Sequence, residues 1–492
     1  MENISSIIQN TKLIYPEIVL SLGIIVVLIF DLIFKNEKKR FLNYITLAVL
    51  AVVAITLRLT NSANNTLAFN IFQINQIAYY FKSIILLATF VVLLYLFTSK
   101  EVDNFVNRLG EFHLLILGML LGMFFIVGAA DLILIYIAME TMSLSSYVLS
   151  GFDKTKMRNS EASLKYLVYG SAASGIMLFG ISLIYGSFAT TNILVIKYLL
   201  LNNFIVNPII VNFAIILLLV GISYKISAAP FHYWAPDVYE GAPISITAYL
   251  SVASKAAGFA MLINVLQTFV LKQNQGWIVY PVFDWKFILI ILSVLSMFFG
   301  NFTALWQNNI KRMLAYSSIA HLGYMLLGII AFSELGLVAV LSYFLIYLFM
   351  NLGAFYVAMV IADNYGIENI DEYKGLGPKL PFLGTTLAIF LVSLVGIPPL
   401  AGFIPKFYLF TALIEKDMIL LSVIALINTV ISLYYYIRVL KEMYLSNSER
   451  DDITEQNIDP LNKYIPILLS IPILLFGVYF SPIYEFLKNI VK

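Results

Sequence analysis

The chain of 492 residues contains no cysteine and only three histidines. The lack of cysteine excludes disulfides, thiolate zinc sites and iron–sulfur clusters held by thiolates, and three histidines are too few to suggest a haem or a dinuclear metal centre. The sequence also has no GxxxxGK[ST] phosphate loop and no GxGxxG between a strand and a helix, so it indicates neither nucleotide hydrolysis nor a bound dinucleotide. We therefore expect no redox cofactor and no metal in this chain.

Charge is also scarce, since 12% of the residues are charged and the formal net charge is +2. A net charge this small gives no reason to expect binding to nucleic acid. Hydrophobic residues make up 61% of the chain, which is far above the usage of soluble domains. Because a bilayer core of about 30 Å needs roughly 20 apolar residues per helix, we predict an all-α polytopic membrane protein in which residues 1–492 form a single membrane domain.

About fourteen apolar segments, numbered here as helices 1 to 14, follow one another with short polar connections. The first is too long for a cleaved signal peptide and should be retained. Lys and Arg are concentrated in loops such as 35–40, 154–158 and 438–450, so the positive-inside rule places these loops in the cytoplasm of a bacterial inner membrane and both termini on the opposite side. The tyrosines at 434–436 fit an interfacial aromatic belt. The segments lie near 13–34, 42–60, 78–98, 112–129, 131–151, 163–186, 209–238, 243–268, 285–304, 313–332, 336–362, 382–414, 418–437 and 463–487.

Two lysines, Lys225 and Lys255, lie within the apolar sequence of helices 7 and 8. A charge at the middle of a membrane helix costs about 2.5–3.5 kcal/mol, so such a residue is by default a candidate functional residue. Pro230 and Pro236 remove backbone donors soon after Lys225, and helix 7 should therefore break just beyond this lysine. The partial negative charge at the end of a half-helix would favour its ammonium group.

Helix 12 repeats this feature, because GIPPLAGFIPKF at 396–407 places three prolines and two glycines beside Lys406. The shift from helix 7 to helix 12 is odd, so matched units would lie in opposite orientations across the membrane. We predict two inverted five-helix repeats, helices 4–8 (residues 112–268) and helices 9–13 (residues 285–437). Helices 1–3 (residues 1–111) precede them, and helix 14 (residues 463–487) follows them.

The remaining charges within the helices differ in depth. At 1.5 Å per residue, Lys255 lies about 18 Å into helix 8 and Glu140 about 14 Å into helix 5, so neither can reach the headgroups. These groups must pair, be hydrated or share protons. Arg58 and Lys82 lie near helix ends, and their long side chains are expected to extend to the headgroups. Lys165 is intermediate and is kept as a candidate relay.

The histidines are candidate proton relays, because an ordinary imidazole titrates near neutral pH. His321 lies about 12 Å into helix 10, and His232 lies between the prolines of helix 7. A lone histidine is more often a packing residue, so both interpretations stay open for each. His113 begins helix 4 and is expected at the interface. Asp237 and Glu240 are expected to cap or orient the junction of helices 7 and 8.

At these residues the chain resembles the antiporter-like membrane subunits of respiratory complex I and of the multisubunit cation/proton antiporters. The resemblance covers nearly the whole chain, and its motifs are together highly specific. They are AMETMSLSSYVLSG (138–151), KISAAPFHYWAPDVYEGAP (225–243), SVASKAAGF (251–259), KRMLAYSSIAHLGYM (311–325) and GIPPLAGFIPKF (396–407). The resemblance implies that Glu140, Lys225, Lys255 and Lys406 are the functional residues of helices 5, 7, 8 and 12. Two related subunits of the same family differ from this chain. One looks to carry a glutamate at the position of Lys406, and the other is longer and ends in a lateral helix.

The family's function, as the resemblance implies it, is to couple NADH:quinone electron transfer to proton pumping. Glu140 and Lys225 would form an ion pair that opens when charge arrives from a neighbouring subunit, Lys255 would relay protons laterally, and Lys406 would load or release them. FMN, iron–sulfur clusters and quinone would belong to partner subunits. The expected partners are other membrane and peripheral subunits of complex I, including the antiporter-like subunit M and small membrane subunits, and membrane lipids. Two alternatives stay open, a component of a cation/proton antiporter and a purely structural membrane subunit.

Overall fold

The computed structural model of the protein describes residues 4–34, 39–60, 66–202, 207–273, 276–279, 285–447, 453 and 458–491. The loop residues 35–38 and 448–450, which contributed to the predicted orientation, lie outside the described residues. The described chain is almost entirely helical and packs into two compact units. Unit 1 consists of Met1–Leu93, Val102–Ile226 and Ala253–Trp285, and unit 2 of Leu94–Glu101, Ser227–Val252 and Lys286–Lys492.

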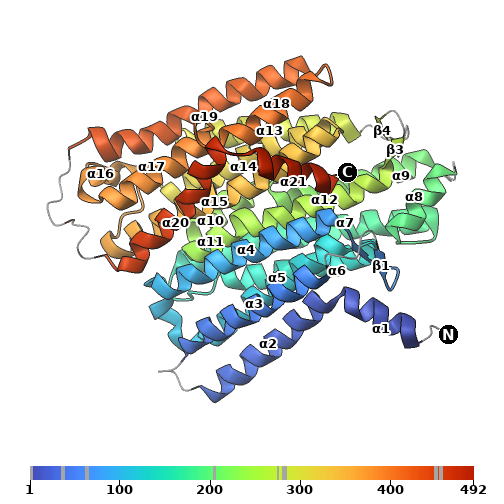
Figure 1. Cartoon of the computed structure of the whole chain (residues 1–492), viewed down its shortest axis with the longest axis horizontal. Coiled ribbons are helices and arrows are strands. Elements are labelled where there is room, and N and C mark those ends of the chain that lie inside the picture. The colour runs from blue at the N-terminus through green and yellow to red at the C-terminus, as the bar shows by residue number, and fades with distance from the viewer. Residues whose placement is uncertain are drawn as a thin grey trace. The chain divides into compact units, whose positions relative to one another are not determined.

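Unit 1 contains the N-terminal helices and two short antiparallel hairpins, whose strands β1, β3 and β4 are labelled in Figure 1. In the first hairpin Thr66 pairs with Ile74, and in the second Val270 pairs with Val279. The last residues of α4 and the first residue of η2 belong to unit 2. The elements are α1 (Ile4–Leu13), α2 (Tyr15–Ile33), α3 (Phe41–Thr60), β1 (Thr66–Ala68), β2 (Phe72–Ile74), α4 (Gln76–Thr98), η2 (Glu101–Arg108), α5 (Leu109–Gly128), α6 (Leu132–Ser150), α7 (Met157–Phe188), α8 (Ile193–Leu201), α9 (Pro208–Ile226), α12 (Lys255–Phe269), β3 (Val270–Gln273) and β4 (Gly276–Val279).

Unit 2 is built around α14 and α15, which are buried on nearly all sides. A helix that is apolar all round is one that other helices surround. The amides of Lys311 and Arg312 donate to the Oδ1 atom of Asn309, which fixes the start of α14. The elements are α10 (Trp234–Gly241), α11 (Ile244–Tyr249), the π-helical turn η3 (Leu250–Ser254, shared with unit 1), α13 (Trp285–Ala304), α14 (Ile310–Ile330), α15 (Glu334–Tyr365), η4 (Ile370–Tyr373), α16 (Leu376–Lys379), α17 (Pro381–Val395), α18 (Phe403–Ile414), α19 (Ile419–Leu445), α20 (Pro460–Val478) and α21 (Ser481–Val491).

Thirteen helical segments in the described residues are long and apolar enough to cross a membrane, by length and composition. The shorter helices α17 and α18 form one further interrupted segment, which gives the predicted fourteen. On α2, Leu22 and Leu32 are 56% and 78% exposed while Glu17 is 1% exposed. Apolar side chains outside and a carboxylate inside are the reverse of a soluble surface. The protein is therefore an integral membrane protein with an all-α fold, as predicted.

The predicted break after Lys225 is confirmed. Helix α9 ends at Ile226 and α10 begins at Trp234. Between them Ser227 has a left-handed backbone with φ 61°, and the Ala229–Pro230 peptide bond is cis. The amide of Ala229 donates to Ser296 Oγ of α13 at 2.8 Å, so the irregular backbone is bonded within unit 2.

The second predicted break, between α17 and α18, is also confirmed. Gly396 ends α17 with φ 86°, and its amide donates to the Ser393 carbonyl at 2.9 Å. The positive φ favours glycine at this position, and a Cβ atom there would lie 2.9 Å from Lys406 Cδ and displace this side chain. The amide of Ala401 donates to the Ile473 carbonyl of α20 at 3.1 Å, which ties the break to the last long helix.

Two details differ from the sequence prediction or remain open. The predicted helix 14 at 463–487 is two helices, α20 and α21, because Tyr479 has a non-helical backbone with φ −128° and ψ 84° and a new helix begins at Ser481. The compact units also do not follow the predicted repeats, since residues 227–252 pack in unit 2. The repeat boundaries therefore stay a prediction.

Candidate functional site

The first cluster of functional side chains is built on one face of α6. The amides of Ile133 and Leu134 donate to Asp131 Oδ1, which fixes the start of this helix. Glu140, Ser143 and Tyr147 follow at spacings of three and four residues, and such residues share a helix face. Glu140 Oε1 is buried and accepts no hydrogen bond from any described residue. This face therefore carries a carboxylate whose charge is not neutralised by direct contact.

Lys225, at the end of α9, is fully buried and points to this face of α6. Its ammonium donates to Ser143 Oγ at 3.0 Å and lies 5.8 Å from the centre of the Tyr166 ring. The predicted direct ion pair with Glu140 is wrong here, because no carboxylate of the described residues pairs with Lys225. Ser143, one helical turn beyond Glu140, takes the ammonium instead. The Glu140 charge acts on Lys225 through space.

Tyrosine hydroxyls extend this polar cluster across α7. Tyr224 donates to the Tyr166 carbonyl at 2.9 Å, and the rings of Tyr147 and Tyr166 meet edge to face at 4.7 Å. A Cβ atom at Gly170 would lie 1.8 Å from the Tyr147 hydroxyl and 2.8 Å from the Tyr224 hydroxyl. Glycine therefore allows both hydroxyls to meet over α7. Ser143, which holds Lys225, and Tyr147 lie one turn apart on the same face of α6, so neighbouring hydroxyls lead away from Lys225.

Lys406 forms the centre of a second cluster, at the break between α17 and α18. It is 3% exposed, and its ammonium donates to the carbonyls of Val395 at 2.8 Å and Leu394 at 3.3 Å. It also lies 4.7 Å from the centre of the Tyr324 ring. These carbonyls end the half-helix α17 and carry partial negative charge. The arrangement that the sequence predicted for Lys225 thus occurs at Lys406.

His321 of α14 belongs to a buried network in unit 2. Its Nδ1 atom is 2.7 Å from the Tyr343 hydroxyl, and its Nε2 atom is 3.1 Å from the Tyr436 hydroxyl. Tyr435 and Tyr436 are 1% and 0% exposed, whereas Tyr434 is 65% exposed. The predicted aromatic belt is therefore wrong for Tyr435 and Tyr436, because these two side chains point inward from α19. Both ring nitrogens of His321 have hydroxyl partners that can donate or accept.

The other two residues predicted from the helix 7–8 region are also buried. His232 lies in the first break, where its ring stacks on Tyr233 at 4.6 Å and Phe299 at 5.8 Å. Its Nδ1 atom is buried and has no hydrogen-bond partner among the described residues. Lys255 is 1% exposed and is the first residue of α12 after the π-helical turn η3. π-helical turns are frequent at functional sites.

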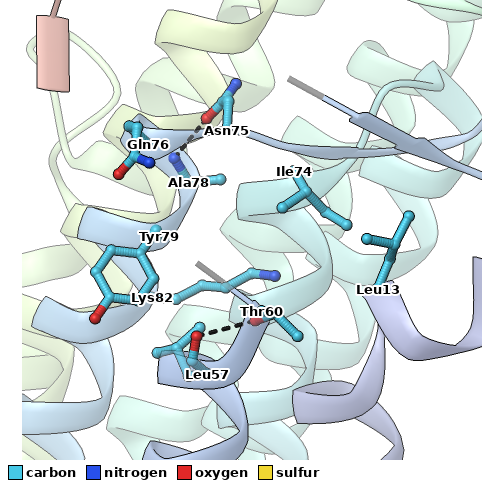
Figure 2. A pocket seen from close by; sticks show the side chains of 9 residues that line it. All are labelled: Leu13, Leu57, Thr60, Ile74, Asn75, Gln76, Ala78, Tyr79 and Lys82. Atoms are coloured by element: carbon cyan, nitrogen blue, oxygen red, sulfur yellow. Dashed lines mark hydrogen bonds between the residues drawn. The ribbon is translucent and has the colours of Figure 1, made fainter. Parts of the chain in front are cut away.

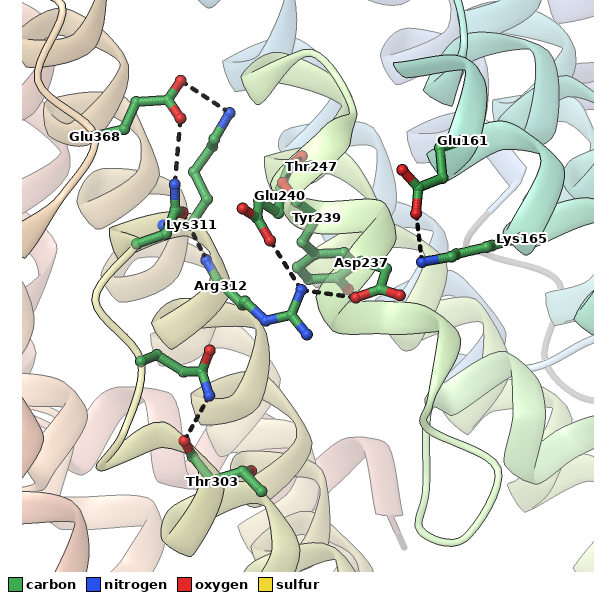
Figure 3. A network of polar contacts seen from close by, with 12 residues as sticks. Glu161, Lys165, Asp237, Tyr239, Glu240, Thr247, Thr303, Lys311, Arg312 and Glu368 are labelled. Carbon is green, nitrogen blue, oxygen red and sulfur yellow. Dashed lines mark hydrogen bonds and ion pairs between the residues drawn. The ribbon is translucent and has the colours of Figure 1, made fainter. Parts of the chain in front are cut away.

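The other three charged residues singled out in the sequence, Lys165, Asp237 and Glu240, lie in ion pairs nearer the surface, which Figure 3 shows. Lys165 pairs with Glu161 one turn earlier on α7 at 2.7 Å, and its side chain is 37% exposed. Within unit 2, Arg312 contacts Asp237 at 2.7 Å and Glu240 at 2.8 Å. Asp237 and Glu240 were expected to cap or orient the helix 7–8 junction. They form no side-chain cap of α10 and instead hold α10 to the start of α14.

The sequence reasoning missed a buried ion pair in the N-terminal helices. Lys82 Nζ of α4 lies 2.6 Å from Glu17 Oε1 of α2, with side chains 6% and 1% exposed, and 4.6 Å from the Phe72 ring. In Figure 2 Lys82 extends beside the pocket formed by the ends of α1, α3 and α4. The expectation that Lys82 reaches the headgroups is wrong. His113 is also buried, with Nε2 2.7 Å from Asn43 Oδ1, and its expected place at the membrane interface stays a prediction.

No sequence signal paired Lys82 with its partner, because Glu17 stands in the first turn of a helix, where an acidic residue is ordinary. No sequence pattern predicts hydroxyl contacts such as the one between Ser143 and Lys225 either. Among the described residues no group of three or more His, Asp or Glu side chains could hold a metal ion. The clusters consist of lysines, tyrosines, a histidine and a carboxylate, groups that can bind and release protons.

An all-helical membrane protein with two interrupted helices and a buried lysine at each break is built like the antiporter-like subunits of energy-converting membrane complexes. The family model described as NADH:quinone oxidoreductase/Mrp antiporter, TM, matches residues 129–432. The chain is 40% identical to NADH-quinone oxidoreductase subunit N of Chlorobium chlorochromatii, over 99% of this chain and 96% of the relative. It is 41% identical to NAD(P)H-quinone oxidoreductase subunit 2 of Gloeothece citriformis, over 91% and 85%. The chain belongs to the subunit N family of NADH-quinone oxidoreductases.

Solved structures agree with this assignment. A chain of respiratory complex I from Thermus thermophilus is similar with a TM-score of 0.78 and 26% identity, over 96% of this chain and 98% of that one. A chain of the Mrp complex from Dietzia sp. DQ12-45-1b has a TM-score of 0.80 at 18% identity, over 98% and 97%. The second likeness concerns the fold alone.

Proposed function

We propose that this chain is the proton-translocating membrane subunit of an NADH-quinone oxidoreductase and carries no redox cofactor itself. The observation that supports this most directly is the way two buried lysines are held. Lys225 contacts a serine hydroxyl and Lys406 contacts two carbonyls, and each lies near a tyrosine ring. The family supplies the electron-transfer context, and the two clusters supply groups that can carry protons.

The neutral partners of Lys225 and Lys406 matter because they determine which charges remain after the ammonium group loses its proton. A lysine in a tight buried ion pair would leave an unpaired carboxylate behind, and such a charge is costly in a dry interior. A lysine held by hydroxyls or carbonyls breaks no direct ion pair when its proton leaves. Lysine is also suited to this role because its proton affinity changes readily with its surroundings, which an arginine's does not. The two clusters are therefore compatible with a charged and a neutral state of each lysine.

The roles of the side chains follow from this geometry. Glu140 sets the charge around Lys225, and a charge arriving nearby moves the Lys225 proton along the hydroxyls of Ser143 and Tyr147. Lys255 relays protons laterally, and Lys406 loads or releases them at the second break. His321, between two tyrosine hydroxyls, His232 in the first break and Lys165, in an exposed ion pair on α7, are candidate relays.

Partners and placement belong to the same proposal. FMN, iron–sulfur clusters and quinone lie in other subunits, and the chain contacts subunit M and small membrane subunits. It lies in a bacterial inner membrane with both termini away from the cytoplasm, since the basic loops favour that orientation. The alternative of a cation/proton antiporter component shares the fold. The identity over full length with subunits named for quinone reduction favours the first reading.

The test is proton uptake into liposomes that contain the assembled complex, measured per NADH oxidised. Lys225→Arg and Lys406→Arg keep the positive charge but remove the ability to release a proton at reachable pH, so pumping should fall at least about tenfold. Lys441→Arg, at an exposed position of α19, is the matched control and should pump normally. Normal pumping in both buried variants would mean that charge alone matters and would favour the purely structural reading.

A further inference from the structure

A groove with a volume of about 380 Å³ runs between α3 and α4 in unit 1. On α3 its wall includes Leu47, Ala51, Ala54 and Arg58, spaced three to four residues apart, so they form one stripe along the helix. The two alanines leave the room that larger side chains would fill. The groove is therefore a feature of the sequence of α3 and not a gap between poorly packed helices.

The α4 wall has the same spacing and length. It includes Tyr79, Ser83, Leu87 and Phe90. Eleven residues separate the first and last wall residues on each helix, which at 1.5 Å per residue gives a groove about 16 Å long. Leu57 of α3 and Tyr79 of α4 also line the neighbouring pocket at the helix ends. Because Arg58 follows Leu57 directly, Arg58 and Tyr79 lie at the same end of the groove.

Polarity is confined to that end. Arg58 is exposed and forms no hydrogen bond or ion pair with any described residue. The Ser83 hydroxyl donates to the Tyr79 carbonyl at 2.8 Å and is thus already satisfied. Beyond these residues the walls are apolar to Leu47 and Phe90, and Phe90 is 42% exposed. A long apolar channel with one cation at its end matches a molecule with a long apolar tail and an anionic head.

We propose that this groove binds one anionic phospholipid, with an acyl chain lying along α3 and α4 and the phosphate held by Arg58. The length fits, because one leaflet of a bilayer core is about 15 Å thick. The head group fits, because a guanidinium matches phosphate oxygens with paired donors. This site goes beyond proton translocation and does not depend on it.

A helix of a neighbouring protein is a poorer occupant. The groove holds about 380 Å³ over about 16 Å of length. A helix, which is about 10 Å or more in diameter with its side chains, could place only side chains of one face in it. A single polymethylene chain is the narrower object, and it needs no hydrogen bonds from the apolar walls.

The test uses the complex purified in mild detergent, with bound phospholipids extracted and counted per chain by mass spectrometry. Ala54→Phe fills the channel and should lose one phospholipid per chain, whereas Arg58→Gln removes only the phosphate contact and should retain roughly fivefold less anionic phospholipid at this site. The matched controls are Ile55→Phe, which adds the same bulk at a position that is 60% exposed and outside the groove, and Lys441→Gln. Unchanged lipid content in Ala54→Phe, or an unchanged amount of bound anionic phospholipid in Arg58→Gln, would overturn the proposal.

Two further measurements separate the occupants. When delipidated complex is incubated with dioleoylphosphatidylglycerol or dioleoylphosphatidylcholine vesicles, the wild type should retain the anionic lipid roughly fivefold better, the factor for about 1 kcal/mol from one arginine near anionic lipid. Arg58→Gln should show no preference. An Ala54→Cys variant, in a chain that otherwise lacks cysteine, should not crosslink to another subunit. Efficient crosslinking would show a protein in the groove and would also overturn the proposal.

Discussion

Two regions of this molecule bury a lysine, and they treat its charge differently. In the N-terminal helices, Lys82 is in a direct ion pair with Glu17 at 2.6 Å. At the helix breaks, Lys225 and Lys406 are held by a hydroxyl and by carbonyls. The pair between α2 and α4 is closed, since each charge is matched by the other. The breaks leave the ammonium among neutral groups, where the surroundings decide whether it stays charged.

The difference separates charges that hold helices together from charges that can move. Removing one partner of a buried ion pair leaves the other unmatched and costs about 3–5 kcal/mol. Removing a proton from a lysine whose direct partners are neutral breaks no ion pair. Burial by itself therefore does not mark a proton-carrying lysine in this fold. The identity of its nearest partner does.

The largest effect is expected at the closed pair. Lys82→Met should lower the free energy of unfolding of the membrane subunit by about 3–5 kcal/mol, because Glu17 is left buried and unpaired. Thermal unfolding of the purified complex and the yield of assembled subunit measure this. The double variant Glu17→Gln/Lys82→Met removes both charges and should recover most of the loss. If the double variant is no better than Lys82→Met, the pair is not the source of stability.

A smaller effect is expected for the carboxylate beside the first break. Glu140→Gln should leave the complex assembled but lower proton uptake per NADH about tenfold. The reason is that a buried charge shifts the pKa of a neighbouring group by about one unit or more. The thermal midpoint should hardly change, because Glu140 makes no direct ion pair with Lys225. Normal pumping by Glu140→Gln and Glu140→Ala would remove Glu140 from the mechanism. A collapse of assembly would instead place it with the closed pair.

The sequence predicted the breaks and misassigned their contacts for one physical reason. Proline fixes the local backbone, so Pro230 and Pro398 report a break wherever the helix lies in the fold. The partner of an ammonium is set by which helices pack together, and that choice is not local. Lys225 therefore contacts Ser143 of α6. The contact with half-helix carbonyls that was expected for Lys225 occurs at Lys406 instead.

The same limit explains the tyrosines and the buried pair. Three consecutive tyrosines fit an aromatic belt by composition, but consecutive residues on a helix point in directions about 100° apart. Tyr435 and Tyr436 consequently face the interior while Tyr434 faces outward. Lys82 lies near the start of α4, where depth alone suggests the headgroups. Lys82 instead points into the protein, because its partner on α2, Glu17, is buried.

The next prediction tests whether the second break is open to water. The irregular backbone at 396–402 should line a hydrated cavity, because such backbone is not tolerated against lipid. In this cysteine-free chain, Lys406→Cys should react with a small polar thiol reagent in intact membranes several-fold faster than Ile389→Cys, in the unbroken part of α17. Equal protection of the two cysteines would mean that Lys406 is sealed, and its part in the proton path would then be withdrawn.

The smallest effect is expected at Lys165, which shares the lysine chemistry but not the burial. Its pair with Glu161 is an exposed contact one helical turn apart, and such pairs contribute about 0.3–0.5 kcal/mol. Lys165→Gln should therefore leave the thermal midpoint within about 1–2 °C of the wild type, by the usual scaling of stability with size. Proton uptake tells whether the side chain also relays protons. A relay would lose pumping in both Lys165→Gln and Lys165→Arg, whereas a surface charge would lose it in neither. Loss only in Lys165→Gln would mean that the positive charge attracts protons to the entrance without passing them on, and salt should weaken that effect because exposed charges are screened.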